Sequence, residues 1–213
     1  IALAGFGLFF VGVSILKDAF SDVATTIDLS SLAATGMVDY IMFVGIGFMM
    51  TLLTQSSSAA ISIALAAAAG SLIALEPAAA MVIGANIGTT STAMIAVIGA
   101  TPNAKRVAAS HVAFNVMTGA VAVVLLPLML SAVDMIRTTL QLQPDAATSL
   151  ALFHTIFNVL GVIIIFPVAE RMTAWLKLRF VSLEEDLGRP RFLDKTRSEE
   201  RRVGKEGRSR WSP

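Results

Sequence analysis

A run of four polar residues interrupts one of the most apolar parts of the sequence. The run consists of Gln55, Ser56, Ser57 and Ser58, and mostly apolar residues flank it on both sides. Serine is favoured at the N-cap of a helix, where free N–H groups and the positive end of the helix dipole attract anions. Hydroxyl and amide oxygens also suit a hard cation such as Na⁺, which prefers oxygen as Ca²⁺ and Mg²⁺ do. The run could therefore bind an anion, bind sodium, or only cap and pack a helix.

A second polar run, GANIGTTST, spans residues 84–92. It offers side-chain oxygens from Asn86, Thr89, Thr90 and Thr92, and its glycines would let another backbone approach closely. Gly84 and Gly88 also have the small-xxx-small spacing that packs membrane helices tightly. Both a second part of an ion site and a helix-packing role remain open for this run.

The short pattern His-x-x-Phe-Asn-Val occurs twice. The first copy contains His111 and Asn115, and the second contains His154 and Asn158. Residues four apart lie on one face of a helix, so each pair could hydrogen-bond to a neighbouring helix. Two copies indicate structural duplication more than duplicated chemistry, and we expect a structural role for these four residues.

The composition predicts that these residues are carried by membrane helices. Hydrophobic residues make up 55% of the 213 positions and charged residues only 15%, against about 25% charged in a typical soluble domain. A helix needs about 20 apolar residues to span a membrane. The stretches 107–130 and 150–169 can span alone, whereas four others are shorter: 40–54, 59–75, 78–85 and 91–100. A further apolar stretch, 1–16, is followed by a more polar connector at 17–39.

The four short stretches form two pairs, and one of the polar runs interrupts each pair. Irregular backbone is tolerated in a membrane only where it is buried in protein or lines a cavity, and secondary transporters place their binding sites at such helix breaks. We therefore predict an all-α membrane protein, a multi-pass bundle with broken or re-entrant helices. The breaks should fall at 55–58 and 86–90 and face each other across the interior.

The residue types that are absent limit the kinds of site that this sequence can form. The chain contains no cysteine, which excludes disulfides and thiolate metal sites. No acidic or basic residue lies inside a predicted span, so a carboxylate proton relay is disfavoured. A multivalent anion there would need helix dipoles, hydroxyls and a co-bound cation, because unpaired charge in a low-dielectric site is very costly. No Gly-x-Ser-x-Gly nucleophile elbow is present, and we expect no enzymatic activity.

Basic residues predict the orientation in the membrane. Lys105 and Arg106 precede the span 107–130, and Arg171, Lys177 and Arg179 follow the span 150–169. By the positive-inside rule both basic ends are cytoplasmic, and the loop 131–149 between the two spans is outside.

Four segments, in this order, resemble the bacterial sodium/phosphate cotransporter family: TQSSSAA, GANIGTTSTA, KRVAASHVAFN and ALFHTIFNVLGVIIIFPV. Members of that family carry two inverted repeats, each with a QSSS-type motif, and bind Na⁺ and phosphate where the motifs meet. The resemblance implies sodium-coupled symport of inorganic phosphate across the bacterial inner (cytoplasmic) membrane, with sodium as the coupling ion and no other cofactor. It implies phosphate binding by Gln55, Ser56, Ser57 and Ser58, and sodium binding by Gln55, Ser57, Asn86, Thr89 and Thr90.

Only one QSSS motif is present, so the chain resembles one repeat, which we interpret as a C-terminal repeat cut at both ends. Residues 1–169 would form the transmembrane repeat, and 170–196 a cytoplasmic linker to a helical domain absent from the sequence. Residues 197–213 resemble the translation of a sequencing-adapter read-through, and we expect them to be disordered. The expected partners are inorganic phosphate, sodium, lipid, and either the other repeat of the same chain or a second copy, without nucleic acid. The alternative is a non-transporting membrane regulator or packing module of the same fold.

Overall fold

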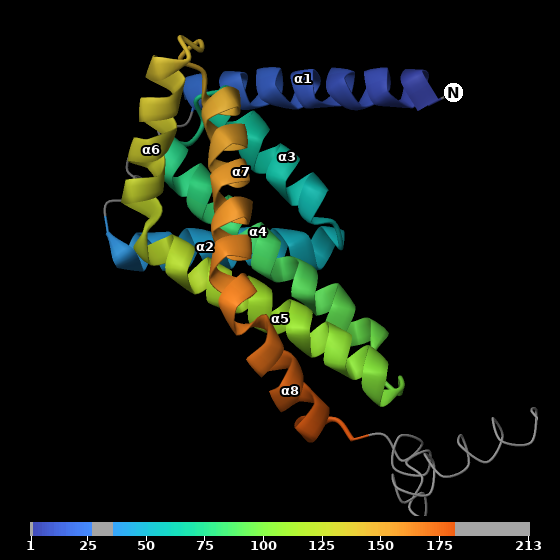
Figure 1. Cartoon of the computed structure of the whole chain (residues 1–213). Coiled ribbons are helices and arrows are strands. Elements are labelled where there is room, and N and C mark those ends of the chain that lie inside the picture. Colours follow the sequence, from blue (N-terminus) through green and yellow to red (C-terminus); the bar gives the residue numbers. More distant parts are fainter. Residues whose placement is uncertain (1, 27–35, 182–213) are drawn as a thin grey trace, which may run out of the picture.

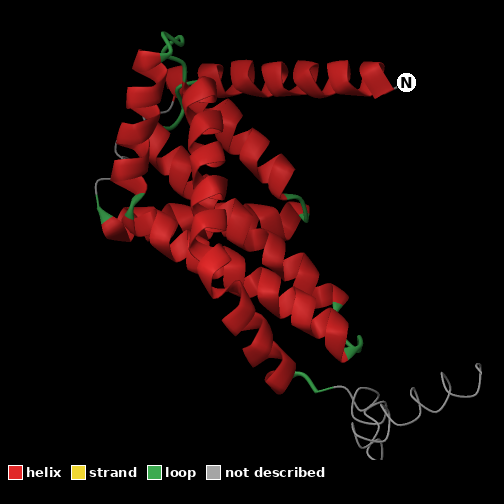
Figure 2. Ribbon diagram, viewed as in Figure 1, coloured by secondary structure: helices red, strands yellow, loops and turns green. Residues whose placement is uncertain are grey.

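The computed structural model describes residues 2–26 and 36–181, and this part of the chain contains helices and no strand (Figure 2). The linker prediction beyond residue 181 and the prediction for 197–213 lie outside the described residues. The helices are α1 (Ala2–Thr26), α2 (Met37–Thr54), α3 (Ser57–Ala69), α4 (Leu75–Ala96), α5 (Pro102–Val124), α6 (Leu126–Thr139), α7 (Ala146–Ile165), the 3-10 turn η2 (Phe166–Val168) and α8 (Ala169–Arg179). Five segments are long and apolar enough to cross a membrane: α1, α2, α4, α5 and the continuous stretch Ala146–Arg179. The predicted all-α, multi-pass membrane protein is confirmed.

Helix α4 is the centre of the bundle and contacts α2, α3, α5, α6 and α7 (Figure 1). Its run from Pro77 to Ala85 is completely buried, and the small side chains in that run let several helices approach at once. By contrast, α1 extends away from the bundle and contacts α3 near its own C-terminal end, where Lys17 lies against Gly70 (Figure 1). Helix α1 also continues to Thr26, well into the stretch that the sequence predicted as a polar connector.

The closest helix crossing joins α2 to α4. A Cβ atom added to Gly47 would lie 2.0 Å from the carbonyl oxygen of Met81, and one added to Gly84 would lie 1.9 Å from that of Val44. A Cβ added to Gly88 would lie 2.6 Å from the Cβ of Thr51. Glycine at these positions brings the two backbones into contact, so the Gly84–Gly88 spacing does pack helices, one of the two roles left open for this run.

The predicted helix break at 86–90 is wrong, because α4 runs unbroken from Leu75 to Ala96. The stretches 78–85 and 91–100 therefore belong largely to one spanning helix. Its polar residues do not interrupt it, since their hydroxyls bond back to the carbonyl three residues earlier: Thr89 to Asn86, Thr90 to Ile87, Ser91 to Gly88 and Thr92 to Thr89. Such local bonds satisfy a hydroxyl inside a helix.

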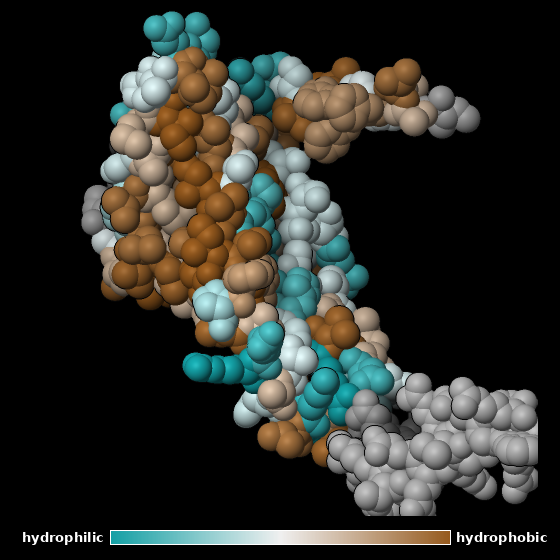
Figure 3. Space-filling model, in the orientation of Figure 1, coloured by the Kyte–Doolittle hydropathy of each residue, from teal (hydrophilic) through white to brown (hydrophobic). Residues whose placement is uncertain are grey.

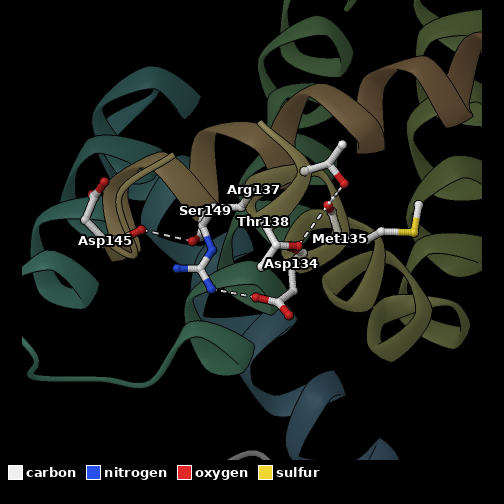
Figure 4. Close-up of polar contacts among 7 residues, drawn as sticks. Asp134, Met135, Arg137, Thr138, Asp145 and Ser149 are labelled. Atoms are coloured by element: carbon white, nitrogen blue, oxygen red, sulfur yellow. Dashed lines mark hydrogen bonds and ion pairs between the residues drawn. The ribbon is translucent and has the colours of Figure 1, made fainter. Parts of the chain in front are cut away.

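The predicted span 107–130 is also divided. Helix α5 ends at Val124, and α6 begins at Leu126 with Pro127 in its first turn, where the missing N–H of proline is tolerated. Helix α6 then continues to Thr139 and α7 begins at Ala146, so only residues 140–145 of the predicted loop 131–149 are not helical. Asp145 begins α7 by accepting a hydrogen bond from the backbone N–H of Thr148 at 3.0 Å. Figure 4 shows that the Asp145 carbonyl also accepts a hydrogen bond from the Ser149 hydroxyl.

An apolar surface covers much of α6 and α7, and polar surface lies at the α6–α7 loop and around α8 (Figure 3). Exposed apolar side chains of α7 and of the turn after it include Val162, Ile163 and Phe166, with exposed fractions of 58%, 64% and 81%. An exposed apolar band between two polar ends is the surface that a lipid bilayer covers.

Candidate functional site: a helix break beside the polar face of α4

The break between α2 and α3 is formed by Gln55 and Ser56. Gln55 has left-handed backbone angles (φ 52°, ψ 26°), which are uncommon for a residue other than glycine, and Ser56 is extended. The Ser56 hydroxyl oxygen accepts a hydrogen bond from the N–H of Ala59 at 3.2 Å and so caps α3. The predicted break at 55–58 is therefore confirmed, although α3 begins at Ser57, two residues before the apolar stretch 59–75.

The N-terminus of α3 offers donors for an anion. The N–H of Ala59 bonds to the Ser56 side chain and the N–H of Ala60 to the Ser56 carbonyl. Within the described residues, the backbone N–H groups of Ser57 and Ser58 have no acceptor. Gln55 and Ser58 are exposed and Ser57 is half-buried, so an anion can reach these groups and the positive end of the helix dipole.

The polar face of α4 offers oxygens for a cation. The hydroxyls of Thr89 and Thr90 donate to carbonyls of their own helix, which leaves their oxygen lone pairs free to accept or to ligate. Asn86 is partly exposed, and its Nδ2 donates to Oδ1 of Asn115 on α5 at 2.9 Å. Its own Oδ1 therefore remains available.

The break and the polar face of α4 are linked through a residue that the sequence reasoning missed. Thr51 lies one turn before Gln55, is completely buried, and donates from Oγ1 to the carbonyl of Ala85 at 3.1 Å. No hydrogen bond joins Gln55–Ser58 directly to Asn86, Thr89 or Thr90 among the residues that the structure describes. A threonine inside an apolar helix, one turn before the polar run, was the signal that could have identified Thr51.

The two copies of His-x-x-Phe-Asn-Val have different surroundings. In each, the asparagine Nδ2 donates to the histidine carbonyl four residues earlier, at 2.9 Å for Asn115 and 2.7 Å for Asn158. Asn115 is 3% exposed and bonds to α4, whereas Asn158 is exposed. His111 and His154 are half-buried. The repeated motif thus supplies the same local bond twice and an interhelical bond once.

The basic residues at the start of α5 lie beside the basic end of α8. Arg106, near the start of α5, donates from Nε to the carbonyl of Phe180 at 2.9 Å and from its guanidinium to the carbonyl of Lys177 at the end of α8. A cation at a helix C-terminus complements the helix dipole. The beginning of α5 and the end of α8 therefore lie at the same end of the molecule.

Comparison with known proteins identifies relatives for most of the chain. The family described as Na⁺/Pi-cotransporter matches residues 8–162. "Uncharacterized protein YqeW" of Bacillus subtilis is 37% identical over 125 residues, which cover 59% of this chain and 39% of that protein. "Putative inorganic phosphate export protein YjbB" of Escherichia coli is 25% identical over 194 residues, which cover 89% of this chain and 34% of that protein. This chain thus spans well under half the length of these relatives, and no solved structure matches it.

Proposed function

Because this chain belongs to the Na⁺/Pi-cotransporter family, we propose that it forms part of a carrier that couples phosphate movement across the membrane to sodium. The name of the Escherichia coli relative describes phosphate export, and the same coupling serves either direction. We assign phosphate binding to Gln55 and the three serines after it. We assign sodium binding to Gln55, Ser57, Asn86, Thr89 and Thr90.

The observation that carries this proposal is the uncharged helix break inside a membrane protein. The N–H groups of Ser57 and Ser58, which have no acceptor in the part of the chain that the structure describes, lie beside hydroxyls at the N-terminus of α3. Helices α2, α3 and α4 contain only Asp39 and Glu76 as charged residues, both in a first turn away from the break. Phosphate at the break would therefore be countered by dipoles and by bound sodium, because an uncompensated anion in a low-dielectric site is too costly.

We also propose how the chain is completed and oriented. The other repeat of the same polypeptide, or a second copy of this chain, would close the site from the opposite side. The carrier would lie in the bacterial cytoplasmic membrane, with residues 131–149 outside and 170–196 in the cytoplasm, because the basic ends of α5 and α8 lie together.

Ion-gradient exchange in proteoliposomes tests the coupling. The complete carrier is reconstituted, and the flux of radiolabelled phosphate is measured under equal inward gradients of sodium, potassium or choline. We expect phosphate flux only under the sodium gradient, and we expect this flux to saturate with both sodium and phosphate concentration. Equal flux with all three cations would overturn the sodium coupling, and no flux from folded protein would favour the non-transporting packing module.

A further inference from the structure

A hydrogen-bonded series of three polar groups connects α5 to the candidate sodium ligand on α4. It runs from the carbonyl of His111 to Nδ2 of Asn115 at 2.9 Å, and from Oδ1 of Asn115 to Nδ2 of Asn86 at 2.9 Å. Asn115 is 3% exposed, and both ends of its amide are engaged. A buried amide whose NH₂ group and oxygen both have partners has one defined orientation.

The donor-to-acceptor direction of these hydrogen bonds is fixed at the His111 end. A backbone carbonyl can only accept, so the NH₂ group of Asn115 must face His111 and its Oδ1 must face α4. That oxygen in turn requires a donor, and the donor is the NH₂ group of Asn86. The Oδ1 of Asn86 is consequently the end of the amide that does not face Asn115, in a residue that is partly exposed.

The packing around the bond fixes the distance between the two helices. One turn after Asn115, a Cβ atom added to Gly119 would lie 2.5 Å from Cδ1 of Ile87, the neighbour of Asn86. Helices α4 and α5 are therefore in close contact beside the amide pair, and the pair is held in one register.

We propose that Asn115 is a positioning residue for sodium: it orients the Asn86 amide so that its oxygen, and not its NH₂ group, faces the coupling ion. The inference rests on the proposed function, in which Asn86 ligates sodium. A free amide could present either end to the ion, and only the oxygen binds a cation. Asn115 itself does not touch the ion.

Asn158 provides a matched control within the same chain. It belongs to the same motif and makes the same bond to the carbonyl four residues earlier, but it is exposed and makes no side-chain bond to another helix among the described residues. Substitution of Asn158 therefore changes the local helix bond alone, whereas substitution of Asn115 also removes the link to Asn86.

The test compares Asn115→Ser with Asn158→Ser in the complete carrier. Serine can bond to the carbonyl four residues earlier, as Ser110 does with Arg106 at 2.8 Å on the same helix, so folding is disturbed as little as possible. Its side chain is too short to reach Asn86. We expect Asn115→Ser to weaken the apparent sodium affinity of phosphate flux about tenfold, as loss of an outer partner does at other metal sites, while the maximal flux per folded molecule is retained. Asn158→Ser should leave both quantities unchanged.

The double variant Asn86→Ala/Asn115→Ser separates this inference from the proposed function. If Asn115 acts through Asn86, its substitution should have no further effect on sodium affinity once Asn86 is alanine. Additive effects of the two substitutions would overturn the positioning role alone. So would an unchanged sodium affinity in Asn115→Ser if Asn86→Ala weakens that affinity. Unchanged sodium affinity in Asn86→Ala would overturn the assignment of Asn86 as a ligand, and the positioning role with it. If Asn115→Ser does not fold, Asn115→Leu, which has the same number and branching of side-chain heavy atoms, replaces it with the same expected results.

Discussion

Thr51 on α2 donates a hydrogen bond across the tightest helix crossing to the carbonyl of Ala85 on α4, over 3.1 Å. Thr51 is one turn from the break at Gln55, and Ala85 is adjacent to Asn86. The bond therefore joins the element that carries the serines to the element that carries the polar face of α4. If the helix break at Gln55 moved relative to Asn86, the packing of α2 on α4 would have to change.

The α2–α4 crossing predicts opposite outcomes for two glycines of the same helix. Gly47→Ala would place a Cβ 2.0 Å from the Met81 carbonyl and force the helices apart, whereas a Cβ on Gly45 meets nothing within 4 Å. We expect Gly47→Ala to lower the free energy of unfolding by about 1–3 kcal/mol and Gly45→Ala to leave it nearly unchanged. Unfolding in mixed detergent micelles measures both, and equal losses would contradict the crossing.

Two buried threonines should respond differently to replacement by valine. The hydroxyl of Thr118 is buried and has no hydrogen-bond partner among the described residues, while that of Thr51 bonds to Ala85. Valine matches threonine in shape, so Thr118→Val should keep or raise the unfolding free energy, and Thr51→Val should lower it by about 1 kcal/mol. A greater loss for Thr118→Val than for Thr51→Val would show that the Thr118 hydroxyl has a partner in the membrane.

The proposed orientation predicts which single cysteines can be labelled. This chain has no cysteine, so Gln143→Cys in the α6–α7 loop and Val181→Cys after α8 each introduce one exposed thiol. In intact cells, a membrane-impermeant thiol reagent should label Gln143→Cys, and Val181→Cys should react only after permeabilisation. The reverse pattern would invert the topology.

Acidification should weaken the start of α7. Hydrogen bonds from the side chain and the backbone N–H of Thr148 hold the pKa of Asp145 below its ordinary value of 3.8 in the folded protein. The stabilisation from this carboxylate is thus complete above the unfolded pKa and is lost as the pH falls through the lower, folded pKa. Asp145→Asn keeps a cap without the charge. Thermal unfolding midpoints should therefore fall further on acidification below about pH 4 in the natural protein than in Asp145→Asn; parallel curves would contradict the cap.

Local chemistry made part of this structure predictable. The Ser56 cap follows from residue type and neighbours, and so does the break beside it. The continuity of α4 was missed because the hydroxyls from Thr89 to Thr92 donate to carbonyls of the same helix. The pattern of polar residues in the sequence does not reveal these bonds. The different surroundings of Asn115 and Asn158 could not be predicted either, since one motif occurs twice and the packing of α5 on α4 decides which copy is buried.

The last prediction concerns the role of the polar run itself, and it separates binding from capping. Gln55→Gly removes the amide but suits the left-handed backbone, and Ser57→Ala leaves the Ser56 cap in place. If the run binds both solutes, each variant should lower phosphate flux and the apparent sodium affinity together, because removing an oxygen that holds sodium also removes charge that holds phosphate. Such coupling is typically worth about 1–3 kcal/mol, or roughly 5- to 150-fold in affinity.

A capping role predicts a different result for the same residues. Ser56→Ala should then cost about 1 kcal/mol of stability, while Gln55→Gly and Ser57→Ala, which do not cap α3, should change neither stability nor transport. Flux must be normalised to folded protein in the membrane, so that lost stability is not mistaken for lost binding. Sodium dependence equal to that of the natural protein in both Gln55→Gly and Ser57→Ala would show that these residues only shape the helix break, and the site would have to lie elsewhere.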